Sequence, residues 1–196
     1  MKQLADAIRA GGQNLGQGIL KIDHILNHQI DPALMRAIGQ ELAGRFRAAR
    51  VDRILTSEVS GIAPALATGM VLQVPVVYAR KRRPITMSGP VYMETAPSHT
   101  RGGEVTLMVA AEFLRDGEQV LIIDDFLASG LTTLAMIRMV QRAQATVAGV
   151  GVVVEKTFEQ GRANLLAAGD ADFPVEALAM VTGMDGDRII LVDDNP

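Results

Sequence analysis

Two adjacent acids and a loop of small and hydroxyl-bearing residues end an apolar run in the segment VLIIDDFLASGLTT, residues 120–133. The aliphatic residues before Asp124 and Asp125 predict a strand that is buried on both faces. Apolar residues at Leu134, Ile137 and Val140 predict a helix directly after the loop. In open α/β sheets, ligands bind outside the carboxyl ends of the strands, which is where these acids would lie. The segment therefore predicts a ligand site at the edge of a sheet.

The same segment combines donors for a phosphate group with acceptors for hydroxyl groups. Backbone N–H groups at the N-terminus of a helix attract anions, and small side chains let the backbone approach them. The carboxylates of Asp124 and Asp125 would accept hydrogen bonds from the neighbouring hydroxyls of a sugar. These properties suit a sugar phosphate, and the alternative is a helix N-cap beside an exposed pair of acids. The loop in question is Ala128, Ser129, Gly130, Leu131 and Thr132.

Other phosphate-binding motifs do not account for the sequence. No GxxxxGK[ST] loop occurs. The stretch GVGVVV at residues 149–154 lacks the third glycine of a dinucleotide-binding fingerprint. That stretch instead reads as the interior of a strand.

Strands and helices in alternation must position the segment. Asp31 is a good N-cap and Pro32 suits the first turn of a helix within residues 30–49. This alternation indicates an α/β domain with a mostly parallel sheet. Further helices are predicted at residues 2–10, 62–72 and 161–169, and strands at residues 53–57, 74–80, 104–114, 119–124 and 146–156 and on both sides of a turn at Asp185–Gly186.

The motif of residues 120–133 resembles the phosphoribosyl-diphosphate (PRPP) motif of the type I phosphoribosyltransferases. The segments LKIDHILNHQIDPALM, SEVSGIAPALATG, VPVVYARK and GVVVEKTFEQGR extend the resemblance, over essentially the whole chain, to the bacterial xanthine phosphoribosyltransferases. The resemblance implies transfer of the 5-phosphoribosyl group from PRPP to xanthine, which gives xanthosine 5′-monophosphate (XMP) and diphosphate in purine salvage. Magnesium is implied as the cofactor.

The resemblance also implies a single domain over residues 1–196 with the type I phosphoribosyltransferase fold. Its mostly parallel central sheet would be flanked by helices, with a core at about residues 36–156. A small hood would be formed by about residues 1–35 and 157–196. The loop at residues 84–104, rich in Pro, Gly, Ser and Thr, would be a flexible lid, with Gly89, Gly102 and Gly103 easing its opening.

Residues for the diphosphate and for PRPP follow from the matched motifs. In SEVSG, Ser60 and Gly61 are assigned to the diphosphate, although the stretch alone reads as an ordinary turn between a strand and a helix. In ARKRR, the resemblance assigns Arg80 and Lys81 to the diphosphate in the site of the neighbouring subunit of a dimer, and the alternative is a solvated run of charge. The residues assigned to PRPP are Asp124, Asp125, Ala128, Ser129, Gly130, Leu131 and Thr132.

The resemblance assigns Leu20, Asn27 and Lys156 to xanthine. A lysine ammonium has only donors, so Lys156 suits the oxo group at C6 of a 6-oxopurine and not the amino group of adenine. Residue type alone leaves open a strand-end lysine that reaches water. Phe126 or Phe158 is expected to contact the purine ring, unless both are core residues.

No catalytic residue is assigned. Related hypoxanthine–guanine enzymes often carry an aspartate where this chain has Ala128, and alanine cannot act as a general base. No side chain is predicted to ligate a metal directly, and Mg²⁺ is expected to arrive with PRPP.

Composition limits the remaining partners. A net charge of −3 over 196 residues argues against general nucleic-acid binding, and no apolar run is long enough to cross a membrane. The lack of cysteine fits a cytoplasmic location, and the resemblance implies a homodimer. Two alternatives stay open: a hypoxanthine–guanine phosphoribosyltransferase, and a PRPP-sensing regulator, for which the N-terminal 30 residues show no basic DNA-binding domain.

Overall fold

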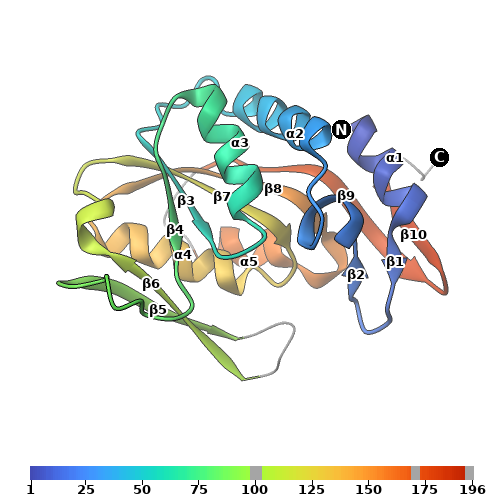
Figure 1. The fold of residues 1–196 in the computed structure, drawn as a ribbon. Helices are drawn as coiled ribbons and strands as arrows, with labels where there is room; N and C mark the ends of the chain where they lie inside the picture. Colours follow the sequence, from blue (N-terminus) through green and yellow to red (C-terminus); the bar gives the residue numbers. More distant parts are fainter. Residues whose placement is uncertain (98–102, 169–172, 193–196) are drawn as a thin grey trace.

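The computed structural model describes residues 1–97, 103–168 and 173–192 and contains a central sheet with six strands in the order β10-β9-β8-β7-β3-β4 (Figure 1). Five strands are parallel, and β10 pairs antiparallel with β9. The predicted, mostly parallel α/β sheet is therefore confirmed. The strands are β3 (Arg53–Ser57), β4 (Val76–Ala79), β7 (Gln119–Leu127), β8 (Thr146–Lys156), β9 (Val175–Asp185) and β10 (Arg188–Leu191).

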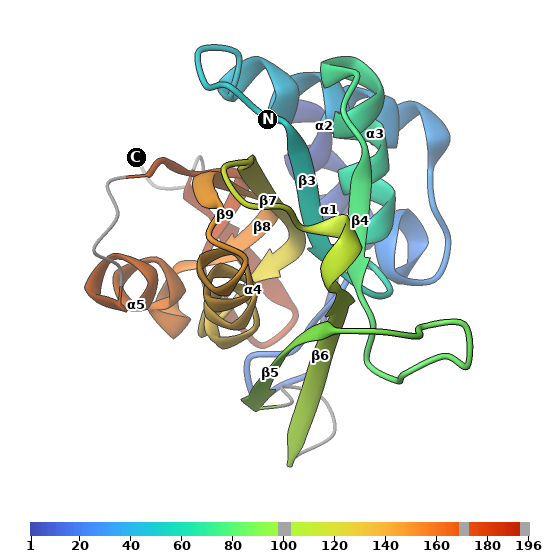
Figure 2. The ribbon, with the colours of Figure 1, turned by 90° about the vertical axis from the view of Figure 1, so that its left-hand side faces the viewer.

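Helices cover both faces of this sheet. Helices α2 (Pro32–Arg45) and α3 (Ile62–Leu72) lie on one face, and α4 (Leu131–Arg142) and α5 (Gly161–Ala168) lie on the other (Figure 2). The carboxylate of Asp31 accepts hydrogen bonds from the N–H groups of Ala33 and Leu34, both at 2.9 Å, so the predicted N-cap is confirmed. The aliphatic runs of β7 and β8 are buried between these two helical layers.

The N-terminal segment contacts the β9–β10 turn. Helix α1 (Lys2–Gly11) is followed by a short hairpin of β1 (Gln13–Asn14) and β2 (Leu20–Lys21) and by a π-helical turn, η1 (Asp23–Asn27). The Asn14 side chain donates to the carbonyl of Gly186 at 2.8 Å, and so joins this hairpin to the β9–β10 turn. The hood and core division stays a prediction, and its boundary at residues 156–157 falls between two neighbouring strands of one sheet.

Residues 84–104 differ from the expected loop. Strand β5 (Val91–Pro97) pairs with β6 (Glu104–Ala110) in a regular antiparallel register over seven residue pairs. This hairpin forms a separate sheet, and two ion pairs hold it to α4, from Glu94 to Arg138 at 2.7 Å and to Arg142 at 2.9 Å. Residues 98–102, including Gly102, lie outside the described residues. The lid function stays a prediction.

The strand predicted at residues 74–80 is shorter and less buried than expected. Strand β4 covers Val76–Ala79 and occupies the edge of the central sheet, where Tyr78 is 42% exposed. Its aliphatic sequence does not distinguish an edge position from a central one. Two short 3₁₀ turns, η2 (Ala111–Phe113) and η3 (Thr157–Glu159), complete the elements of the described residues.

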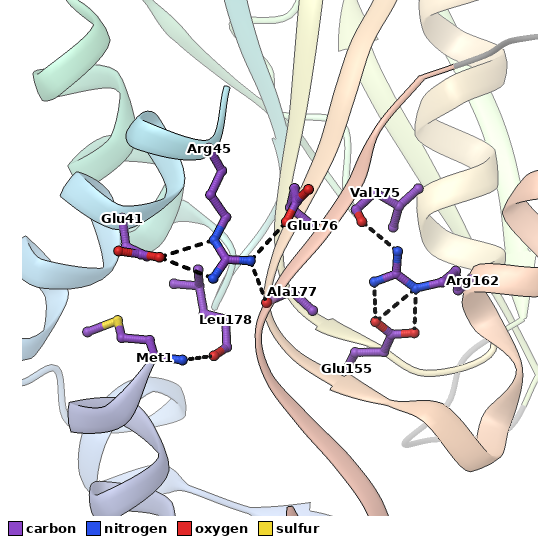
Figure 3. A network of polar contacts seen from close by, with 9 residues as sticks. All are labelled: Met1, Glu41, Arg45, Glu155, Arg162, Val175, Glu176, Ala177 and Leu178. Carbon is purple, nitrogen blue, oxygen red and sulfur yellow. Dashed lines mark hydrogen bonds and ion pairs between the residues drawn. The ribbon is translucent and has the colours of Figure 1, made fainter. Parts of the chain in front are cut away.

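Two arginines fix the start of β9 from different sides (Figure 3). On one side, Arg45 of α2 contacts Glu41, at 3.1 Å, and Glu176, at 2.8 Å. On the other side, Arg162 of α5 pairs with the buried carboxylate of Glu155 at 2.5 Å and donates to the carbonyl of Val175 at 2.5 Å. Arg162 therefore ties α5 to the end of β8 and to the start of β9.

Replacing Arg162 with alanine is expected to lower the free energy of unfolding by about 3 kcal/mol, because it leaves the Glu155 carboxylate buried without a cation. Urea unfolding followed by circular dichroism measures the change. The exposed Arg47 supplies the control, since Arg47→Ala should alter the same quantity by less than about 0.5 kcal/mol. Equal effects of the two substitutions would show that the Glu155–Arg162 pair does not hold α5 in place.

Candidate active site

A cleft of about 570 Å³ lies at the carboxyl ends of β3, β7 and β8. This is the edge at which the sequence predicts a ligand site. Gly61 and Arg80 were also predicted but do not line the cleft. The predicted residues that do line it are Leu20, Asn27, Ser60, Lys81, Asp124, Asp125, Ala128, Ser129, Gly130, Leu131, Thr132 and Lys156.

The loop between β7 and α4 forms one end of the cleft. Gly130 is the N-cap of α4 and has a φ of 79°, a left-handed conformation that favours glycine. A Cβ atom at this position would also lie 3.0 Å from the carbonyl oxygen of Gly161, so the loop packs tightly against the start of α5. The first N–H groups of α4 have no partner within the helix, and this end of the cleft is therefore suited to an anion.

The Asp124 carboxyl group is buried at the bottom of the cleft. It is 4% exposed, and it accepts hydrogen bonds from the Asp125 N–H at 3.1 Å and from the Ser57 hydroxyl at 3.5 Å. Burial raises the pKa of Asp124 well above its usual value, and the charge of the neighbouring Asp125 adds to the rise. The cation of Lys81 acts on this pKa in the opposite direction.

Gly61 supports this carboxyl group from behind. It is the N-cap of α3, and a Cβ atom there would lie 2.6 Å from Asp124 Oδ1 and 2.3 Å from Thr56 Oγ1. Glycine is needed at this position because the β3–α3 turn and the end of β7 approach each other so closely. The structure therefore places Gly61 beneath the site, whereas Ser60 from the same turn lines the cleft.

Glu58 connects that turn to the cationic stretch after β4. Its carboxylate accepts a hydrogen bond from the Lys81 N–H at 2.6 Å and lies 2.9 Å from Arg80 Nε as an ion pair. The Glu58–Val59 peptide bond is cis. Lys81 faces the cleft, while the Arg80 guanidinium lies between Glu58 and the ring of Tyr78, at 5.7 Å from the ring centroid.

Lys156 and the N-terminal hairpin form another part of the cleft wall. The Lys156 ammonium donates to the carbonyl oxygen of Gly18 at 2.9 Å and pairs with the carboxylate of Glu159. Because an ammonium has three N–H donors, one remains for a ligand in the cleft. Asn27 donates its side-chain N–H to Asp125 at 3.1 Å, which leaves its amide oxygen available as an acceptor.

The two phenylalanines considered for the purine ring differ in position. Phe126 lines the cleft and packs partly against the core, whereas Phe158 is 40% exposed and does not line the cleft.

Sequence reasoning did not identify several residues around the cleft. Glu159 and the hairpin residues Gln17, Gly18 and Ile19 lie near Lys156, and only the glycines of NLGQGIL gave a signal, for a turn. Residues of the β5–β6 hairpin form another wall: Ala96, Pro97, Val105 and Leu107.

A phosphoribosyl transferase domain model matches residues 25–165 of the chain. The chain is 50% identical to the xanthine phosphoribosyltransferase of Deinococcus deserti over 193 residues, which cover 98% of each protein. It is 44% identical to the xanthine phosphoribosyltransferase of an Exiguobacterium species over 193 residues, again with 98% coverage of each.

Solved structures agree with the fold. An adenine phosphoribosyltransferase from Thermoanaerobacter pseudethanolicus superposes with a TM-score of 0.73 at 21% identity, over 90% of this chain and 99% of that one. The Trypanosoma brucei adenine phosphoribosyltransferase, solved with AMP, pyrophosphate and ribose-5-phosphate, gives a TM-score of 0.75 at 21% identity, over 97% of this chain and 90% of that one. These likenesses confirm the predicted type I phosphoribosyltransferase fold.

The Asp124→Asn variant is expected to be more stable than the wild type at pH 7. Between the usual aspartate pKa of about 3.9 and the raised pKa of the folded state, the unfolded chain loses a proton that the folded chain keeps. The free energy of unfolding therefore falls as pH rises through this window, and a neutral asparagine avoids the loss. Urea unfolding at pH 7 and at pH values near 4 measures the gain, which should shrink toward zero as the pH is lowered.

The exposed Asp116, substituted by asparagine, is the control and should show no such gain. A stability difference between Asp124→Asn and wild type that grows as the pH falls would contradict the cause given for the pKa shift.

Proposed function

Because the chain belongs to the phosphoribosyl transferase domain family, we propose that it transfers the 5-phosphoribosyl group from PRPP to xanthine, giving XMP and diphosphate in purine salvage. One observation carries the proposal. A single cleft is lined by the N-terminus of α4, by an adjacent pair of acids, and by Lys156 and Asn27. These groups match the phosphate, the ribose diol and the oxopurine of the nucleotide.

The β7–α4 loop would hold the 5′-phosphate. Backbone N–H groups of residues 128–132 and the hydroxyl of Thr132 are the donors at this end of the cleft. Asp125, the more accessible of the two acids, would accept hydrogen bonds from the ribose hydroxyls. Binding both ends of the sugar fixes the position of its anomeric carbon, which is the main contribution that orientation makes to a displacement reaction.

The leaving diphosphate would be bound beside Ser60 and Lys81. The transition state is expected to resemble an oxocarbenium ion, so cations and N–H donors at the departing group stabilise the charge that develops there. Lys81 is held toward the cleft by the hydrogen bond between its N–H and Glu58. Arg80 would serve the diphosphate only after leaving its ion pair with Glu58.

Xanthine would lie between Leu20, Phe126 and the polar groups of Asn27 and Lys156. The remaining N–H of the Lys156 ammonium would donate to the oxo group at C6, and the Asn27 amide would pair with the second oxo group or its neighbouring N–H. No general base is proposed, because Ala128 carries no titratable group at the position where related enzymes have an aspartate. Xanthine is itself acidic, and the protein contributes by positioning it and excluding water.

Mg²⁺ is proposed to arrive with PRPP and to be held by its phosphates, because the ion prefers oxygen ligands and usually keeps substrate phosphates among them. When bound, the ion would neutralise negative charge on the diphosphate.

We also propose a cytoplasmic homodimer that binds neither nucleic acid nor membranes. Apolar side chains are exposed on the β3–α3 turn, α3 and β4, which precede the cationic stretch in the chain: Val59 at 71%, Leu66 at 53%, Met70 at 70% and Tyr78 at 42%. Exposed apolar side chains are typical of an interface, and an interface on these elements would bring Arg80 or Lys81 of one subunit close to the other. No helix in the described residues has the length and hydropathy needed to cross a membrane.

The proposal is tested by measuring turnover of xanthine, guanine, hypoxanthine and adenine with PRPP and Mg²⁺. Xanthine should give the highest kcat/KM, and adenine should react roughly 10⁴-fold more slowly, because its amino group leaves the Lys156 donor unpaired. Higher kcat/KM for guanine or hypoxanthine would favour a hypoxanthine–guanine enzyme. Tight PRPP binding without turnover of any base would favour a PRPP-sensing regulator, and DNA binding at moderate salt would then be the next measurement.

Substituting Asp125 with asparagine should raise the KM for PRPP by roughly 10- to 100-fold, because a hydrogen bond to a charged acceptor contributes roughly 1.5–3 kcal/mol. Steady-state kinetics with varied PRPP provides the measurement. The exposed Asp185, changed to asparagine, is the control and should leave the KM unchanged. An unchanged KM with lost turnover in Asp125→Asn would place this carboxylate in the chemical step instead.

A further inference from the structure

The carbonyl groups of the β7–α4 loop face α5. The side-chain amide of Asn164 donates a hydrogen bond to the Ser129 carbonyl oxygen at 2.9 Å. One residue earlier, the Ala128 carbonyl oxygen lies against Gly161, where a Cβ atom would approach it to 2.2 Å. Neither Gly161 nor Asn164 lines the cleft, so both carbonyls are engaged from outside it.

The direction of the Ser129 carbonyl also sets the direction of the Gly130 N–H, because both belong to one planar peptide. In a trans peptide the C=O and N–H groups point in opposite directions. The Ser129 carbonyl points to α5, so the N–H of Gly130 points away from α5. Ser129 and Gly130 both line the cleft, and this N–H is therefore directed to the side from which an anion would enter.

The orientation of the Ser129–Gly130 peptide requires a restraint, because Gly130 does not fix it by itself. Gly130 has a φ of 79°, and a glycine populates positive and negative φ about equally well. Rotation of the Ser129–Gly130 peptide would turn the carbonyl oxygen, with its partial negative charge, to the anion. A hydrogen bond that holds the carbonyl on the far side opposes that rotation.

The helix that carries Asn164 is itself well fixed. Arg162, two residues earlier, donates to both oxygens of the buried Glu155 carboxylate, at distances of 2.5–3.2 Å, and to the Val175 carbonyl (Figure 3). The N-terminal turn of α5 is thereby joined to the end of β8 and to the start of β9. A restraint built on a fixed element holds a binding geometry more closely than one built on a loop.

We propose that Asn164 is a positioning residue for the phosphate site: it fixes the Ser129–Gly130 peptide so that the Gly130 N–H faces the 5′-phosphate of the nucleotide. This inference rests on the proposed function, because it takes the anion to be the phosphate of PRPP or XMP. Asn164 acts through the loop and does not touch the substrate. Its loss should therefore weaken recognition of the phosphate and leave recognition of the base unchanged.

The test compares the affinities of XMP and xanthosine, which differ only in the 5′-phosphate, for wild type and variants by calorimetry. Asn164→Ala should weaken XMP binding by about 2- to 10-fold, the net range of one hydrogen bond, and leave xanthosine binding unchanged. Asn164→Gln, which keeps the amide donor on a longer side chain, should recover part of the loss. The exposed Leu166 on the same helix, as Leu166→Ala, is the control and should change neither affinity.

The outcomes separate this inference from the proposed function. If wild type prefers XMP to xanthosine but Asn164→Ala does not change that preference, the positioning role is wrong and the proposed function stands. An equal loss for both ligands would show a general structural effect and would also overturn the role. If wild type shows no preference for XMP, the phosphate site of the proposed function fails and the inference fails with it.

Discussion

The geometry of the proposed site depends most on the close packing of the Asp124 carboxyl group of β7 against Gly61 in the β3–α3 turn. Gly61 has no Cβ atom to hold the β3–α3 turn away from it, and burial disfavours the charged form of the acid. Such a group weakens the fold at neutral pH, as polar groups at functional sites often do. A bound cation or sugar hydroxyl would stabilise the charged form of the Asp124 carboxyl group. The loss of stability would therefore be offset when the proposed site is occupied.

The parallel register of the sheet explains why so many separate segments meet there. Strands β3, β7 and β8 pair in parallel, and their carboxyl ends therefore present the β3–α3 turn, the β7–α4 loop and Lys156 at one edge. Where these segments approach closely, the residues in contact must be small, as Gly130 and Gly161 are. The Glu155–Arg162 pair holds α5 against the same edge of the sheet. Because α5 contacts the β7–α4 loop, this ion pair also helps to position that loop.

Sequence predicted the parts of the structure that depend on local pattern. Strand β8 and helix α3 occupy the predicted residues. An aliphatic run predicts the buried strand, and a glycine turn marks the start of the helix. The β5–β6 hairpin was not predicted as regular because Glu94, a charged residue, is buried in it and is neutralised by arginines more than 40 residues away. The β7–α4 loop was predicted because its residues are contiguous, whereas Glu58–Lys81 and Asn164–Ser129 join distant segments and leave no local signal.

Different parts of the chain support the groups proposed to bind the phosphate and those proposed to bind the base. The loop proposed to bind the phosphate leads into α4 and contacts α5 through Ser129 and Asn164, and α5 is anchored through the buried Glu155. At the groups proposed to bind the base, the Lys156 ammonium donates to Gly18 of the N-terminal hairpin and pairs with Glu159. A base that took its remaining donor would complete the contacts of one ammonium group. Because the same ammonium binds the hairpin and would bind the oxo group, the choice of base and the position of the hairpin would be linked through one side chain.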